Sequence, residues 1–132
     1  HGICILLDAH SIVSEAPRFF DGHLPDLNLG TADEKSCDES LAQSAFAVLK
    51  HAEGFTAVHN GRFKGGFITR HYGVPGDKIH ALQLEVAQRC YMDEAAPSLY
   101  DASRAAPLKA VLIALVEKLM NWRPMPGADT RT

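Results

Sequence analysis

A short apolar run followed at once by polar residues constrains the fold of this chain most strongly. Residues 3–7 read Ile-Cys-Ile-Leu-Leu, and residues 8–11 read Asp-Ala-His-Ser. A run of this kind is typical of a strand buried on both faces, as in a parallel sheet. In open α/β sheets, ligands bind at the carboxyl ends of such strands. The run therefore predicts a central strand that ends at a candidate functional residue, His10.

The remaining patterns predict alternating strands and helices. We expect a long ordered loop over residues 15–35, and then a helix that starts with a capping box at residues 36–39 and is ended by Gly54. Strands are predicted over residues 55–59 and 79–86. A short helix over residues 86–93 follows, and the final helix carries the apolar stripe from Leu108 to Leu119. This order predicts an α/β fold with an open, mostly parallel sheet flanked by helices.

Length and composition limit the organisation of the chain. At 132 residues, with 46% hydrophobic and 22% charged residues, it has the size and composition of one globular domain. We expect residues 1–123 to belong to a single α/β domain and residues 124–132 to form a frayed tail. The chain enters a predicted buried strand directly after His1, and its patterns predict only three strands. We therefore expect it to be part of a larger domain.

Charge, hydropathy and cysteine usage exclude several classes of partner. The net charge is −3, so no strong basic field is available for nucleic acid. No apolar run approaches the roughly 18 residues needed to span a bilayer, so we expect no membrane partner. Three widely spaced cysteines indicate a reducing compartment such as the cytoplasm.

His10 is the first residue that could carry chemistry. At the end of a strand it could be a metal ligand, a general base or a substrate contact, or it could cap a loop by hydrogen bonding. Asp8 could orient the His10 ring as a neighbouring carboxylate, or it could cap the turn.

Glu85 is the second residue that could carry chemistry. Alternation in the strand over residues 79–86 places Gln83 and Glu85 on one face and His80, Leu82, Leu84 and Val86 on the other. A carboxylate within a sheet is seldom without a partner, and burial would raise its pKa toward a value suited to acid–base work. The alternative is a structural Glu85 in an ion pair with Arg89.

The segment over residues 60–73 is the densest polar stretch. Arg62, Lys64 and Arg70 lie among four glycines, a pattern suited to a small anionic substrate because arginine binds carboxylates with two parallel hydrogen bonds. The alternative is a solvated basic hairpin. The segment matches no phosphate-binding loop, and the chain contains no HExxH, CxxC or GxSxG motif.

Four blocks together resemble the N-formylglutamate amidohydrolase (N-formylglutamate deformylase) family. They are residues 8–12, residues 24–31, residues 60–73 and residues 83–85, and the resemblance runs from about residue 2 to about residue 94. It implies a fold similar to zinc carboxypeptidases and aspartoacylases. It also implies an enzyme that acts on a linear amide, hydrolysing N-formyl-L-glutamate to L-glutamate and formate in histidine degradation.

The resemblance also implies roles for individual residues. His10 matches a ligand of Zn²⁺ or another divalent metal, and Glu85 matches the carboxylate that activates the attacking water. Arg62 and Arg70, helped by Asn60, match positions that could bind the two carboxylates of the glutamyl group. Family members are about twice this length, so the resemblance implies a carboxy-terminal half without the early metal ligands, which alone could be inactive.

Two alternatives remain open from the sequence. One is an aspartoacylase-like or carboxypeptidase-like hydrolase of another N-acyl acidic amino acid. The other is a non-catalytic half-domain that keeps an anion-binding pocket and forms a homo-oligomer to cover an open sheet edge. Metal content would separate an enzyme from the half-domain.

Overall fold

In the computed structural model, which describes residues 2–125, four strands form one open sheet in the order β1-β4-β2-β3. The strands are β1 (Cys4–Ile12), β2 (Leu27–Gly30), β3 (Ala57–His59) and β4 (Ile79–Ala87). β1 pairs with β4 and β2 pairs with β3 in parallel, whereas β2 and β4 are antiparallel. The expected open α/β sheet is confirmed, and the antiparallel pairing makes it a mixed sheet.

β1 differs from its prediction in length and position. It continues past Leu7 to Ile12, because each residue from Cys4 to Ile12 is in register with a residue of β4. Within residues 2–125, β1 lies at an edge of the sheet, so the predicted central position is wrong there. β4 takes the internal position instead, and it is buried from His80 to Ala87.

β2 lies within the stretch predicted as a loop. Its four residues are all buried, and it occupies the position between β4 and β3. Sequence patterns missed it because four residues bounded by turn-forming residues such as Pro25 are too few to show a period. The loop prediction for residues 15–35 is therefore wrong over Leu27–Gly30.

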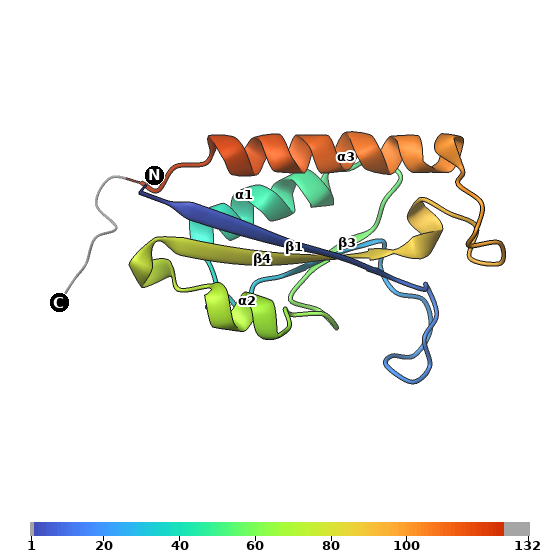
Figure 1. The fold of residues 1–132 in the computed structure, drawn as a ribbon, viewed down its shortest axis with the longest axis horizontal. Coiled ribbons are helices and arrows are strands. Elements are labelled where there is room, and N and C mark those ends of the chain that lie inside the picture. Colours follow the sequence, from blue (N-terminus) through green and yellow to red (C-terminus); the bar gives the residue numbers. More distant parts are fainter. Residues whose placement is uncertain (1, 126–132) are drawn as a thin grey trace.

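The helices lie on both sides of the sheet. Figure 1 shows α1 (Glu39–Lys50) and α3 (Ala102–Asn121) on one side and the short α2 (Phe67–Tyr72) on the other. Two 3-10 turns flank β4, at Pro75–Asp77 and at Gln88–Cys90. The second turn lies where a short helix over residues 86–93 was expected.

The start of α1 also differs from its prediction. Asp38, not Ser36, caps the helix, because its carboxylate accepts a hydrogen bond from the Ser40 amide at 2.8 Å. The Ser36 hydroxyl instead donates to the Ala81 carbonyl of β4 at 2.7 Å. A serine could satisfy either partner, and the fold places Ser36 beside β4.

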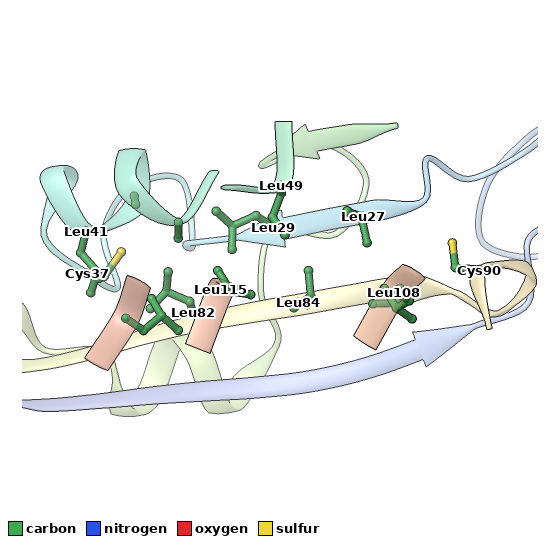
Figure 2. Packing of buried hydrophobic residues seen from close by; sticks show 14 of the residues in the cluster. Leu27, Leu29, Cys37, Leu41, Leu49, Leu82, Leu84, Cys90, Leu108 and Leu115 are labelled. Atoms are coloured by element: carbon green, nitrogen blue, oxygen red, sulfur yellow. The ribbon is translucent and has the colours of Figure 1, made fainter. Parts of the chain in front are cut away.

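The hydrophobic core fills the space between the sheet and the two longer helices. Figure 2 shows leucines from β2 and β4 meeting leucines from α1 and α3, and the fully buried ones are Leu27, Leu29, Leu41, Leu49, Leu82, Leu84 and Leu115. Each fully buried leucine stabilises the fold by about 1.5–3 kcal/mol. This packing fixes which face of β4 points toward α2.

Two further expectations concern the whole chain. In the part that the structure describes, no helix is both long and apolar enough to span a membrane. The predicted frayed tail falls largely on residues 126–132, which lie outside the described residues.

Candidate functional site

Three polar residues line up across three neighbouring strands. Glu85 of β4 is in register with His10 of β1 on one side and with Asn28 of β2 on the other. Side chains of directly paired residues project to the same face of a sheet, so the three form one row. The expectation that His10 and Glu85 lie on one face, near the carboxyl ends of neighbouring strands, is confirmed.

The row lies on the side of the sheet that carries α2. Gln83 shares the face of Glu85 because the two are separated by one residue along β4. The Gln83 side chain accepts a hydrogen bond from the main-chain amide of Gly66, the residue that precedes α2, at 2.8 Å. The polar row and the glycine-rich segment therefore meet on the same face.

Close packing holds the glycine-rich segment against this face. A Cβ on Gly30 would lie 2.5 Å from the main-chain carbonyl carbon of Lys64 and 2.6 Å from the Gly65 nitrogen. Only glycine allows main chain to approach this closely. β2 thus needs Gly30 where the segment crosses it, and this crossing places α2 beside β4.

His10 is the exposed end of the row, and Asp8 lies beside it on β1. The two side chains project from the same face of β1, and the His10 Nε2 lies 2.8 Å from Asp8 Oδ1. About half of the His10 side chain is exposed, while Asp8 is largely covered. A carboxylate partner of this kind fixes the orientation of an imidazole ring and leaves Nδ1 as the nitrogen that can meet a ligand.

Glu85 is buried beside His10 and Asp8. Its residue is 7% exposed, and burial raises the pKa of its carboxyl group above the usual value, an effect that Asp8 adds to and His10 opposes. Among residues 2–125, Glu85 is in no ion pair. A raised pKa suits a carboxyl group that must take and return a proton.

The ion pair between Glu85 and Arg89 that was the structural alternative is wrong, because Arg89 pairs elsewhere. The Arg89 guanidinium lies 2.8 Å from Asp26 Oδ1 and donates to the Leu24 carbonyl at 2.6 Å. The spacing of four residues between Glu85 and Arg89 suits a helix. Because β4 is extended and ends at Ala87, this spacing does not bring the two side chains together.

The segment over residues 60–73 contains α2 and is not a hairpin. Asn60 adopts a left-handed conformation, its side-chain oxygen accepts from the Thr31 amide at 2.8 Å, and its nitrogen donates to the Thr31 hydroxyl at 2.9 Å. These contacts join the loops that follow β2 and β3. Both polar atoms of Asn60 are thus already engaged within the protein.

The two arginines of this segment keep most of their hydrogen-bonding capacity. Arg62 donates through Nε to the Phe19 carbonyl at 2.6 Å, and Arg70 donates through Nη1 to the Gly65 carbonyl at 2.8 Å. Both are exposed, and neither forms an ion pair within the described residues. Arg70 belongs to α2 and so lies on the same side of the sheet as Glu85.

The residues of the row fit a metal ion only in part. His10 offers one ring nitrogen, with Asp8 placed to orient it. The structure brings together no group of three or more His, Cys, Asp or Glu side chains that could hold a metal, counting residues 2–125. A catalytic zinc usually has three protein ligands, so these residues do not complete such a site by themselves.

Two buried polar side chains, one in the row and one on α2, have no role predicted from the sequence. Asn28 is 1% exposed and stands in the row itself, and Thr69 of α2 is fully buried. Each has a side-chain oxygen with no hydrogen-bond partner among the described residues. The sequence contained a sign of Asn28, because it is the one polar side chain in the Leu-Asn-Leu-Gly segment over residues 27–30.

Comparisons with known proteins agree with the resemblance. The family model described as N-formylglutamate amidohydrolase matches residues 1–92. The N-formylglutamate deformylase of Pseudomonas aeruginosa is 54% identical over 121 residues, which are 92% of this chain and 46% of that protein. The N-formylglutamate deformylase of Pseudomonas putida is 51% identical, with 92% of this chain and 45% of that protein covered.

A solved structure agrees at the level of the fold. The crystal structure of N-formylglutamate amidohydrolase from Ralstonia eutropha matches with a TM-score of 0.74 at 24% identity, over 90% of this chain and 43% of that chain. The chain therefore spans slightly less than half the length of the relatives it matches. Because the family model covers most of its sequence, this chain belongs to the N-formylglutamate amidohydrolase family.

Proposed function

We propose that the protein containing this chain hydrolyses N-formyl-L-glutamate to L-glutamate and formate. The observation that carries the proposal is the row of His10, Glu85 and Asn28 on one face of the sheet, beneath a glycine-rich segment that carries two exposed arginines. Two relatives more than half identical to this chain are named as N-formylglutamate deformylases. The kinship with zinc carboxypeptidases and aspartoacylases belongs to the same proposal.

Glu85 is the general base and acid of the proposed reaction. It removes a proton from the water whose oxygen attacks the formyl carbon. It then delivers this proton to the nitrogen of the departing glutamate as the C–N bond breaks, so the products are formate and the free amino acid. The raised pKa of its buried carboxyl group suits a residue that must both accept and release a proton.

A divalent metal, with Zn²⁺ as the first candidate, completes the proposal. When bound, such an ion lowers the pKa of water and polarises the carbonyl group. His10 would hold it through Nδ1, since Asp8 already engages Nε2. The remaining ligands are not found among residues 2–125, and the chain spans less than half of its curated relatives.

The glutamyl group supplies two carboxylates that need cationic partners. Arg62 and Arg70 carry guanidinium groups with further donors on exposed side chains, and each can bind a carboxylate with two parallel hydrogen bonds. Asn60 supports them by holding the loop that begins the segment. A small anionic substrate is therefore the partner we propose, in a cytoplasmic setting consistent with three free cysteines.

The half-domain alternative competes with this proposal on one observation. The described residues hold no complete group of metal ligands, and β1 has an unpaired outer edge within residues 2–125. A second copy of the chain could cover that edge. Metal content and oligomeric state, measured together, separate this alternative from the enzyme.

The test is formate release from N-formyl-L-glutamate by the complete gene product. We expect hydrolysis that is lost on treatment with a chelator and restored by Zn²⁺. N-acetyl-L-glutamate, N-formyl-L-alanine and N-acetyl-L-aspartate are the comparison substrates, because the first changes the acyl group, the second changes the side chain and the third changes both. Faster hydrolysis of an N-acetyl substrate would move the protein to the aspartoacylase-like alternative. A metal-free oligomer that hydrolyses none of them would favour the half-domain.

A further inference from the structure

Asn28 is held in one orientation by main-chain acceptors. Its side-chain nitrogen donates to the Pro25 carbonyl at 2.7 Å and to the Glu85 carbonyl at 3.1 Å. An amide nitrogen has two protons, so both of them are used. A flipped amide would point its oxygen at two carbonyl oxygens, and for this reason the side chain is fixed with Oδ1 directed elsewhere.

The Oδ1 atom of Asn28 is a buried acceptor without a donor. The residue is 1% exposed, and within residues 2–125 no group donates a hydrogen bond to Oδ1. Buried polar atoms in folded proteins nearly always have a hydrogen-bond partner. An oriented acceptor without one is therefore a place where a ligand with a donor group can bind.

The position of Asn28 indicates which donor this is. Asn28 and Glu85 are directly paired on neighbouring antiparallel strands, and the Cβ atoms of such pairs lie about 4.5–5.5 Å apart. His10 is paired with Glu85 on the other side, so a substrate amide whose carbonyl group points toward His10 has its nitrogen beside Asn28. The Glu85 carboxylate has no proton to offer Oδ1 when it is ionised, whereas a secondary formamide has one N–H.

We propose that Asn28 Oδ1 accepts a hydrogen bond from the N–H of the scissile amide. The same hydrogen bond is kept to the nitrogen of the amine as it departs. The inference rests on the proposed function, and it adds a substrate-binding residue that selects amides carrying an N–H. An ester presents an oxygen at the same place. Two facing acceptors are unfavourable, so Asn28 discriminates against the ester.

The experiment compares N-formyl-L-glutamate with the formate ester of L-2-hydroxyglutarate, in which oxygen replaces the N–H. The measured quantity is the ratio of kcat/KM for the amide to kcat/KM for the ester, determined with the complete gene product. We expect Asn28→Ala to lower this ratio by about 5- to 100-fold, the effect of losing a hydrogen bond to a buried acceptor. Absolute reactivity of the ester cancels because each ratio is compared with that of the parent.

Two further variants control for folding and for general disturbance of the site. Asn28→Asp keeps an acceptor oxygen but loses the donors to Pro25 and to Glu85, so it should keep the amide preference despite lower thermal stability. Thr69→Val removes another unpartnered buried oxygen from the same side of the sheet and should leave the ratio unchanged.

The outcomes separate the inference from the proposed function. If Asn28→Ala slows both substrates equally, or if Asn28→Asp loses the amide preference as fully as Asn28→Ala, Asn28 only anchors the strands and the inference is overturned. If Asn28→Ala does not fold, the ratio for Asn28→Asp decides. A parent protein that hydrolyses neither substrate would overturn the proposed function, and with it this inference.

Discussion

The two faces of β4 are almost equally buried and serve different purposes. Leu84 is 1% exposed and Glu85 is 7% exposed, although they are neighbours in sequence and point to opposite sides. Leu84 meets α1 and α3 in the hydrophobic core, which we call the dry face. Glu85 joins His10 and Asn28 on the opposite side, which we call the polar face.

The difference shows that burial alone does not mark a core position. The dry face is covered by helices of 12 and 20 residues, whereas the polar face is covered by a helix of six residues and a glycine-rich segment. Buried charges are costly unless they are paired, yet Glu85 has no ion-pair partner in the described part of the chain. Such a cost is expected at a functional site rather than in a core.

The largest effect should come from Glu85→Gln on the polar face. Loss of a general base typically lowers turnover by about 10²–10⁴-fold. Metal content should not change, because the proposal assigns Glu85 the role of base and not of ligand. Thermal stability at pH 7 should not fall, since the variant removes a buried charge. Steady-state kinetics and metal analysis of the complete gene product check this. Turnover near that of the parent would rule out Glu85 as the base.

Leu84→Ala tests the neighbouring residue on the dry face. Truncating a buried leucine costs about 2–5 kcal/mol in the free energy of unfolding. We expect that loss in urea denaturation, with turnover per folded molecule unchanged. Leu84→Met keeps the volume and should cost less than about 1.5 kcal/mol. A variant with unchanged stability and reduced turnover would show that the two faces are not separate in function.

Arg62→Lys and Arg70→Lys test whether these two arginines bind the carboxylates of the substrate. A lysine keeps the charge but loses the planar fork that binds carboxylates. At least one variant should weaken kcat/KM by about 1.5–3 kcal/mol, the range for hydrogen bonds to charged groups. Arg104→Lys on α3, on the other side of the sheet, is the matched control and should change it by less than about 0.5 kcal/mol. If all three behave alike, the arginines do not bind substrate.

The smallest effect is the pH dependence that His80 adds to the dry face. Burial lowers the pKa of this imidazole below its ordinary value of 6.5, while Asp38 opposes the shift. Its Nδ1 accepts a hydrogen bond from the Asp38 amide at 3.1 Å, which requires an unprotonated Nδ1. As the pH falls below about 6.5, the unfolded chain takes up a proton that the folded chain refuses, so the free energy of unfolding decreases.

Replacing His80 with asparagine isolates this contribution. The His80→Asn side chain keeps an acceptor near the Nδ1 position and does not titrate. Between the lowered pKa and pH 6.5, the parent should lose up to about 1.4 kcal/mol per pH unit more than the variant, because one proton is linked to unfolding. His59, whose pKa is also lowered by burial, contributes equally to both proteins. Parallel stability profiles would show that His80 is not the linked group.

The sequence by itself determined the elements whose patterns are long enough to show a period. Alternation along β4 separated Glu85 and Gln83 from Leu82 and Leu84, and the stripe from Leu108 to Leu119 located α3. The four blocks that resemble the family also pointed to the family that the family model shows, because residue types at given positions are readable without coordinates.

Only the tertiary structure decided which of these residues meet. β2 is a strand because β4 and β3 supply its hydrogen bonds on both sides. The pattern of four residues alone does not predict this pairing. Arg89 forms its ion pair with Asp26, a residue 63 positions away in the chain, and not with Glu85. The orphaned oxygen of Asn28 likewise depends on two carbonyl groups brought together by folding. Side-chain identity is local, but register and hydrogen-bond partners are set by packing between segments distant in the chain.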